Sequence, residues 1–271
     1  KNTKVTGLQW TEFHIAWNCE SPYFSDKRVR KAMSYAFDHD EMIDKIFYKL
    51  YEKCNGPFHY TAKFYPKNAP PFFKQDLDKA EDLLDAAGWD DSDGDGIRDK
   101  EVNGRTIPFD FNLHCSTTPV SLKVSELLKD NLEQIGINCQ VKPTEFTVLQ
   151  QVCRDHKFHA TMAGWGTGTD PATLVNIFGT GEGRNFGLYS NQEVDRLFEE
   201  GAREFDEEKR HAIYAKIHEL LAEDQPYTWL YYRNSFWGFN KKLRGYNFSP
   251  RGVYGVSPGF NSLWIPAESS F

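Results

Sequence analysis

The sequence predicts an α/β protein, and three observations support this fold class. First, 39% of the 271 residues are hydrophobic and 26% are charged, which is typical of a folded globular chain. Second, segments with a three- and four-residue apolar period are interspersed with segments rich in β-branched and aromatic residues. Third, residues 107–143 have the strand–helix–strand pattern of a βαβ crossover.

The first part of the chain is expected to contain one strand and two helices. The aromatic and β-branched run 13–19 predicts the strand. Ser25 is the predicted N-cap of a helix whose apolar positions recur every three or four residues as far as Ala36. A second, short helix is expected over about 40–47. Residues 55–75 are rich in proline and aromatic side chains without periodicity, which predicts a long ordered loop.

The middle of the chain contains the predicted crossover. Asp76 is the expected N-cap of a helix that ends at Gly88, and an acidic, glycine-containing loop follows over 90–104. The next helix begins with Thr118-Pro119, and proline fits the first turn because the N–H it lacks would have no helical partner there. Crossover connections join neighbouring parallel strands, so the two flanking strands are expected to be parallel. The three segments of this unit are strand 107–115, helix 119–135 and strand 137–143.

Three helices and two strands are expected in the remainder of the chain. A helix is predicted over about 147–156 and a strand over 158–165. The capping box at 190–193 predicts the start of the next helix, and Asp206 predicts the N-cap of another. A strand is expected over 227–240, and the last thirty residues have no helical period.

Composition excludes several classes of protein. The net charge of −7 argues against a nucleic-acid binder, which needs a basic surface. No apolar run reaches the roughly 18 residues that a spanning helix requires. Five cysteines have no metal-ligand spacing, and they fit either buried thiols or up to two disulfides with one thiol left over. These are Cys19, Cys54, Cys115, Cys139 and Cys153.

The acidic loop has the pattern of a calcium-binding loop. Acidic residues stand at positions 1, 3, 5 and 9, with a glycine at position 6, and calcium prefers six to eight hard oxygen ligands. Position 12 is Val102 instead of a bidentate glutamate, with Glu101 beside it, so modest affinity is expected. The alternative is an acidic turn held together by Asp side-chain to backbone hydrogen bonds. The predicted ligands are Asp91, Asp93, Asp95 and Asp99 through their carboxylates and Ile97 through its carbonyl.

No motif in the sequence argues for catalysis. The chain contains no GxSxG, HExxH or GxxxxGK segment, and the glycine clusters 164–168 and 179–183 do not have the GxGxxG spacing. Abundant carboxylates carry no information on acid–base pairs without coordinates. We therefore expect a protein that is not an enzyme, with no catalytic residue and no required cofactor.

Several segments nevertheless carry a resemblance in their common order. Residues 24–38, FSDKRVRKAMSYAFD, have the pattern F-x-D-x-RVR-x-A-x-x-Y-A-x-D. They are followed by AAGW at 86–89 and by a helix–strand segment over 128–146. Residues 163–171 then have AGW before Asp-Pro, and 189–226 contain YSNQEVD and EDQP. Together these segments resemble the extracellular solute-binding proteins of the dipeptide/oligopeptide class, family 5, which capture ligands for ABC importers.

This resemblance implies a periplasmic-binding-protein-like lobe of type II, with a mixed sheet flanked by helices. Residues 1–245 are expected to be the second, C-terminal lobe of a two-lobed protein that closes on its ligand, and 246–271 the segment that returns to the first lobe. The implied partners are a ligand, the permease subunits and the missing first lobe, which is expected to precede residue 1 with its export signal. The implied location is periplasmic or extracytoplasmic, with a membrane anchor expected at the absent N-terminus.

The implied binding edge follows the strand that ends in Gly164-Trp165. A glycine-rich loop at the carboxyl end of a strand is a common ligand-binding position in open α/β sheets, which supports this placement. Trp165 is expected to pack on ligand, and Phe146 matches an aromatic position of the peptide-binding relatives. The predicted ligand-binding residues are Phe146, Met162, Trp165, Gly166, Thr167, Gly168, Thr169 and Asp170.

Two departures weaken the expectation of a free short peptide. Gly168 stands where close peptide-binding relatives have an ammonium-binding aspartate, and Met162 where an arginine can bind the ligand carboxylate. Asp170 can replace the aspartate, but Asp170-Pro171 also fits a helix N-cap. The main expectation is a peptide-binding lobe. The alternatives are an oligosaccharide binder of the same fold, with Thr167 and Thr169 bonding hydroxyls, and a hydrolase.

Overall fold

A six-stranded mixed sheet forms the centre of the molecule, with strand order β2-β8-β1-β7-β5-β6. The computed structural model describes residues 2–245 and 259–267. The strands of this sheet are β1 Asn2–Trp17, β2 Glu52–Lys53, β5 Asp110–Ser116, β6 Asn138–Thr144, β7 Ala160–Gly166 and β8 Tyr227–Asn240. A separate hairpin consists of β3 Asp99–Val102 and β4 Arg105–Pro108.

Helices cover both faces of the sheet. They are α1 Lys27–Ala36, α2 His39–Glu41, α3 Leu77–Ala86, α4 Pro119–Glu133, α5 Phe146–Arg154, α6 Val175–Phe178, α7 Gln192–Arg203 and α8 Glu207–Asp224. A π-helical turn η1 covers Met42–Ile46, and 3₁₀ turns η2 and η3 cover Pro171–Leu174 and Gly259–Ser262. No helix within residues 2–245 and 259–267 is long and apolar enough to cross a membrane.

The predicted crossover is confirmed, and the sheet is mixed as expected. β5 is parallel to both β6 and β7, whereas β1 is antiparallel to its two neighbours β7 and β8. Thr118 caps α4 through a bond from the N–H of Ser121, with Pro119 in the first turn. The carboxyl ends of β5, β6 and β7 therefore lie at one edge of the sheet.

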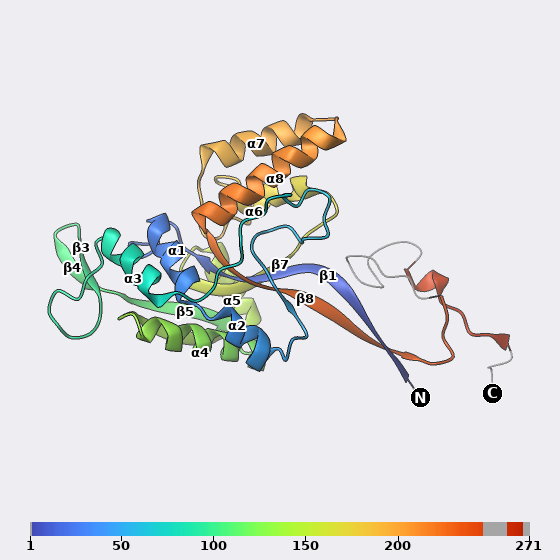
Figure 1. Cartoon of the computed structure of the whole chain (residues 1–271), viewed down its shortest axis with the longest axis horizontal. Helices are drawn as coiled ribbons and strands as arrows, with labels where there is room; N and C mark the ends of the chain where they lie inside the picture. Colours follow the sequence, from blue (N-terminus) through green and yellow to red (C-terminus); the bar gives the residue numbers. More distant parts are fainter. Residues whose placement is uncertain (1, 246–258, 268–271) are drawn as a thin grey trace.

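Two apolar clusters pack on opposite faces of the sheet. The first contains buried residues of α1, α3 and α4, and the second contains those of α6, α7, α8 and the segment 54–64. Strand β8 contributes to both because side chains alternate between faces, with Leu230 in the first cluster and Trp229 in the second. Figure 1 shows α7 and α8 on one side of the strands and α4 on the other.

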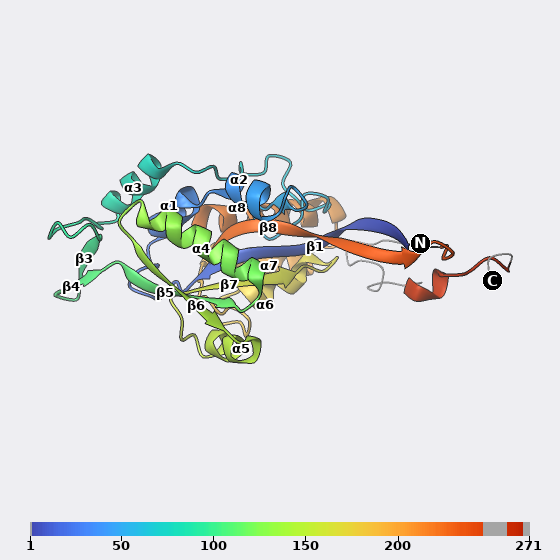
Figure 2. The ribbon, with the colours of Figure 1, turned by 90° about the horizontal axis from the view of Figure 1, so that it is seen from below.

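Strands β1 and β8 form a long antiparallel ribbon. Their pairing runs from Ala16↔Tyr227 to Asn2↔Asn240, with irregularities between Leu8 and Glu12 and between Phe13 and His14. The ribbon projects beyond the helices, as Figures 1 and 2 show. The strand predicted over 13–19 starts too late and ends two residues too late compared with β1. Its true start was missed because the N-terminal half of β1 is mostly polar and lacks the apolar signal of a strand.

The acidic loop predicted over 90–104 contains strand β3, so that expectation was wrong in part. Asn103 and Gly104, both at positive φ (52° and 75°), form the two-residue turn that joins β3 to β4. Asn-Gly is the usual pair for such a turn because both positions need left-handed backbone. The expected strand 107–115 is consequently divided at Phe109 between β4 and β5.

Two predicted caps lie one residue too early. Asp26, not Ser25, caps α1 by accepting from the N–H of Arg28, and Ser25 belongs to the preceding turn, where its N–H donates to the carbonyl of Ser21. Asn191, not Ser190, caps α7. The caps at Asp76 and Asp206 are confirmed. Other bounds move by one or two residues, and the helical turns of η2 and α6 were not predicted.

Few residues near the end of the chain are described, so the predicted domain boundary is hardly tested. Most of the predicted return segment, 246–271, lies outside the described residues. Within the described part, an isolated bridge joins Arg244 to Trp264. The division into a lobe over 1–245 and a return segment stays a prediction.

Candidate functional site

The candidate binding edge consists of the carboxyl ends of β5, β6 and β7 and the loops that follow them. Parallel strands bring these ends together, which is why an open α/β sheet binds ligands there. Phe146 starts α5 just after β6, and its side chain is 64% exposed. Trp165 and Gly166 end β7. The topology therefore unites most of the predicted site residues at one edge.

Trp165 is half-buried at this edge and is not sealed in the core. Its side chain packs against the second apolar cluster. The indole Nε1 donates to the hydroxyl of Tyr227 at 3.3 Å, and the ring of Phe186 lies 5.8 Å away between centroids. The guanidinium carbon of Arg184 lies 5.9 Å from the centre of the indole ring. The indole is thus held from three sides while part of it faces solvent.

A buried polar group lies beneath Trp165. The imidazole of His14 stacks on Tyr227 with ring centres 3.8 Å apart, and its Nδ1 lies 2.7 Å from Glu12 Oε2. Glu12 and His14 are both buried, and Glu12 is the register partner of Trp165 across the β1–β7 ladder. Burial raises the pKa of Tyr227, so its phenol stays neutral and accepts the indole N–H. These contacts fix the orientation of Trp165.

The loop after Trp165 contains one hydroxyl bound within the protein and one at the surface. Thr167 is buried, and both its N–H and its hydroxyl donate to the carbonyl of Trp10, at 2.8 and 3.2 Å. Thr169 is exposed, as is Gly166, and Gly168 is half-buried. Thr167 therefore holds the loop onto β1, and Thr169 is the hydroxyl of this loop that a ligand can reach.

Asp170 is a helix N-cap, which is the alternative that the Asp170-Pro171 sequence allowed. Its side chain caps η2 by accepting from the N–H of Ala172 at 3.0 Å. The guanidinium of Arg210 in α8 donates to the same carboxylate at 2.7 Å and holds its pKa below the usual range. The carboxylate is thus ionised, but its charge is already paired within the chain. A ligand ammonium would have to compete with Arg210 for it.

Met162 is not brought to the edge. Its side chain is 4% exposed and belongs to the first apolar cluster, where Ser125 Oγ lies 3.9 Å from its sulfur. Strand alternation explains this, because residues 162 and 165 of β7 point to opposite faces. The expectation that Met162 contacts ligand is therefore wrong in this structure.

Sequence reasoning missed two features of this edge. One is a cluster of hydroxyls at the end of β5, where Ser116, Thr118 and Ser121 lie 2.8–3.0 Å from one another. The other is Arg184, which comes from the α6–α7 loop. The hydroxyl cluster could have been predicted from the sequence, since the predicted parallel strands put residue 116 at the same edge as Trp165. Arg184 had none, because it is remote in sequence.

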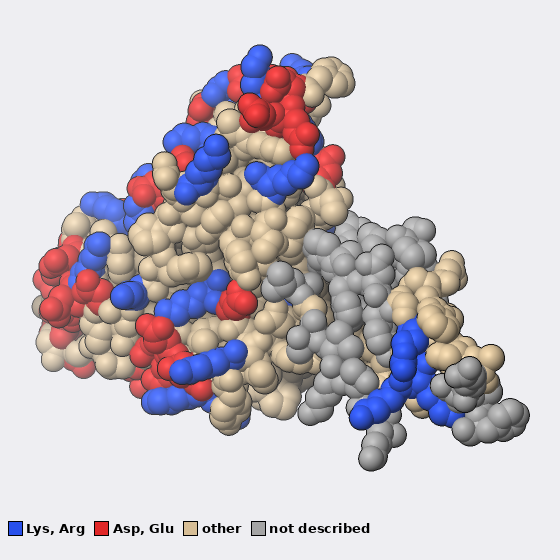
Figure 3. Space-filling view, turned by 45° about the vertical axis from the view of Figure 1, so that its right-hand side comes forward, with Lys and Arg blue, Asp and Glu red and all other residues tan. Residues whose placement is uncertain are grey.

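The acidic loop brings together three of its four predicted carboxylates. Oxygens of Asp91, Asp93 and Asp99 lie within 4.8 Å of one another, and Asp95 is not part of this group. Asp91 accepts from the N–H groups of Gly94, Asp95 and Gly96, which is the hydrogen-bonded turn of the alternative interpretation. Figure 3 shows acidic side chains gathered at this end of the molecule. Calcium binding by this loop stays a prediction.

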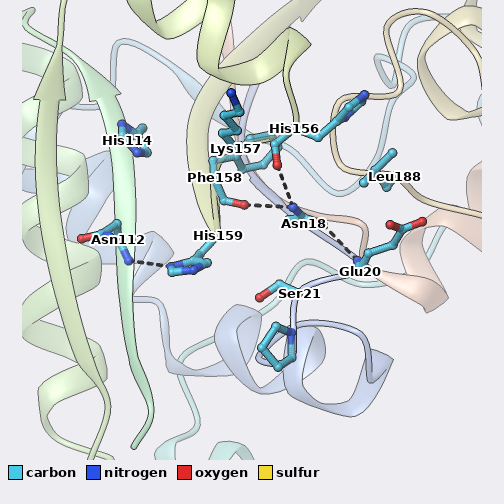
Figure 4. Close-up of a pocket in the computed structure, with 11 residues that line it drawn as sticks. Asn18, Glu20, Ser21, Asn112, His114, His156, Lys157, Phe158, His159 and Leu188 are labelled. Carbon is cyan, nitrogen blue, oxygen red and sulfur yellow. Dashed lines mark hydrogen bonds between the residues drawn. The ribbon is translucent and has the colours of Figure 1, made fainter. Parts of the chain in front are cut away.

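A pocket of about 520 Å³ lies at the amino end of β7, beside the middle of β5. Asn112, His159 and His156 line it, and Asn18 bonds the carbonyls of His156 and Phe158 (Figure 4). Burial lowers the pKa of His159, whose Nδ1 lies 3.2 Å from the N–H of Asn112. The polar contacts described for this pocket join residues of the chain to one another, so they hold the pocket together.

The five cysteines are free thiols in the structure. Cys19 is half-buried and the other four are buried. Of the two alternatives that the sequence left open, the structure therefore has buried thiols. Burial raises the pKa of Cys139 and of Cys54, which keeps both thiols protonated.

Comparison with known proteins connects this geometry to one family. Residues 1–186 match the family described as bacterial extracellular solute-binding proteins, family 5 Middle. The oligopeptide-binding protein AppA of Bacillus subtilis is 30% identical over 259 residues, which cover 93% of this chain and 47% of that protein. This chain thus spans about half the length of that relative.

Solved structures show the same architecture. The structure of AppA from Bacillus subtilis in complex with a nonapeptide has a TM-score of 0.87 and 29% identity, covering 98% of this chain and 52% of that one. NikZ from Campylobacter jejuni in complex with Ni(L-His) has a TM-score of 0.83 and 22% identity, covering 97% and 53%, and shows the shared fold. Because the family match covers more than half of the residues, this chain belongs to the bacterial extracellular solute-binding proteins of family 5.

Proposed function

We propose that this chain is the ligand-binding lobe of an ABC-importer substrate-binding protein and that its ligand is a peptide. The observation that carries the proposal is the exposed edge formed by Trp165, Phe146 and the loop 166–170 in a chain of this family. The likeness to AppA, a protein whose name and structure refer to oligopeptides, supports a peptide as the ligand.

The whole protein has a second lobe in this proposal, and the ligand lies between the two. Capture takes place in the periplasm or elsewhere outside the cytoplasmic membrane, with an anchor at the N-terminus. The closed protein then delivers its peptide to the permease. The chain performs no chemistry and needs no cofactor, and a calcium ion in the 91–99 loop would have a structural role.

Isothermal titration calorimetry with a set of unrelated peptides tests the proposal. The full-length protein should bind at least one peptide far more tightly than the 271-residue chain does, because one lobe supplies only part of the buried surface. Trp165→Ala in the full-length protein should weaken this binding. Phe205→Ala is the matched control, since Phe205 is fully exposed at the turn between α7 and α8.

Two results would overturn the proposal. One is the absence of peptide binding by the full-length protein, and the other is equal affinity of the two chain lengths. Hydrolysis of a bound peptide would favour the hydrolase alternative. Mass spectrometry of the products detects such hydrolysis, and circular dichroism shows whether the sample is folded.

An oligosaccharide ligand is the second candidate function. Two observations favour it: the carboxylate of Asp170 is already paired with Arg210, and the hydroxyls of Ser116, Thr118 and Ser121 lie at the binding edge. A thermal-shift screen of peptides against oligosaccharides separates the two candidates. Stabilisation by sugars and not by peptides would replace the first proposal with the second.

A further inference from the structure

Arg184 brings a cation to the indole at the binding edge. Its guanidinium carbon lies 5.9 Å from the centre of the Trp165 ring, within the range of a cation–π contact. Arg184 is exposed, and no carboxylate of the described residues lies within 4.0 Å of its side-chain nitrogens. Part of the indole face is thereby covered, and a ligand that approaches Trp165 meets a positive charge.

The backbone around Arg184 is held firmly. The N–H of Arg184 donates to the carbonyl of Asn176 at 3.0 Å. The next residue, Asn185, is buried, and its side-chain amide donates to the carbonyls of Gly179 and Tyr189 at 2.9 and 2.7 Å. Phe186, two residues on, packs against Trp165. The loop therefore presents Arg184 at a defined place, which reduces the entropy lost when its side chain binds a partner.

Two carboxylates that are close in sequence to Trp165 or to Arg184 have hydrogen-bond partners within the chain. Asp170 accepts from Arg210 at 2.7 Å, and Glu182 accepts from the side-chain amide of Asn176 at 3.2 Å. Arg184 thus has no ion-pair partner among the described residues, and the charge of Asp170 is already paired with Arg210. Such a guanidinium suits a carboxylate from outside the chain, because the planar group can donate two parallel hydrogen bonds.

We propose that Arg184, supported by the ring of Trp165, binds a carboxylate of the peptide ligand, so that the site favours ligands with this carboxylate over matched ligands that lack it. This inference rests on the proposed peptide-binding function. The carboxylate belongs either to the peptide C-terminus or to an acidic side chain, and the two sources share the same chemistry at Arg184.

The test uses the full-length protein and matched peptides in calorimetric titrations. One arm compares a binding peptide that has a free C-terminus with its C-terminal amide, and the other compares glutamate with glutamine at each acidic position. Arg184→Gln should weaken binding of the carboxylate-containing peptide roughly 10- to 100-fold, the range expected for a lost charge-assisted hydrogen bond. The same variant should bind the matching neutral peptide with almost unchanged affinity.

Arg196→Gln is the matched control because it removes the same charge from an exposed arginine of α7 that pairs with Glu193 and Glu200. It should leave both affinities unchanged, and thermal melting shows whether each variant is folded. If peptides bind but Arg184→Gln alters acidic and neutral peptides equally, the carboxylate anchor is wrong and the peptide-binding function stands. If no peptide binds the wild-type protein, both proposals are overturned.

Discussion

Replacing His218 by leucine should remove a measurable part of the acid sensitivity of the fold. His218 is a fully buried residue of α8, and neither of its ring nitrogens has a hydrogen-bond partner within residues 2–245 and 259–267. Its ring packs beside Phe58 and close to Gly56, where an added methyl group would lie 2.3 Å from Cε1. Burial lowers the pKa of His218 from 6.5 to about 3.

The sign and size of the effect follow from proton linkage. Because the folded pKa of His218 is lowered, the unfolded chain binds more protons below pH 6.5, and stability is lost as the pH falls through that range. Each pH unit below 6.5 costs about 1.4 kcal/mol, so lowering the pH from 7 to 5 costs about 2 kcal/mol through this residue. At pH 7 the leucine should be neutral or stabilising, since the buried nitrogens are unpaired.

Urea denaturation at pH 7 and at pH 5, followed by tryptophan fluorescence, measures this difference. The free energy of unfolding of His218→Leu should fall by about 2 kcal/mol less between the two pH values than that of the wild type. Phe58→Leu is the control, because it changes the same packing without removing a titratable group. Equal pH dependence of the wild type and His218→Leu would refute the buried, uncharged state of His218.

Three further predictions concern stability and reactivity. Gly201→Ala should destabilise the fold by roughly 1–3 kcal/mol in urea denaturation, because the new Cβ would lie 2.8 Å from the Tyr214 ring. Gly238→Ala is the control, since a Cβ at residue 238 meets nothing within 4 Å. Equal effects of the two substitutions would contradict the packing of Gly201 against Tyr214. Calcium should raise the melting temperature after chelator treatment and Asp91→Asn should abolish the rise, whereas no shift at millimolar calcium would exclude the predicted loop site. A thiol reagent should label Cys19 first and the four buried cysteines only on unfolding, and rapid labelling of all five would contradict their burial.

Local sequence patterns determined most of the elements of this chain. The caps at Asp76, Asp206 and Thr118 were predictable because each depends on a side chain that accepts from the backbone N–H three residues later. The βαβ unit was predictable for a similar reason, since its apolar periods and its handedness follow from the chain itself. The candidate binding edge followed from these elements, because parallel strands end on the same side of a sheet.

Packing between distant segments decided the contacts within that edge. Met162 and Trp165 are both apolar residues of β7, and their different roles depend on the faces that the helices cover. Asp170 is paired because α8 places Arg210 beside it, 40 residues later in the chain. Arg184 reaches the indole from another loop. Short-range periodicity carries no information on which remote side chains meet, so these charges and contacts are properties of the tertiary structure alone.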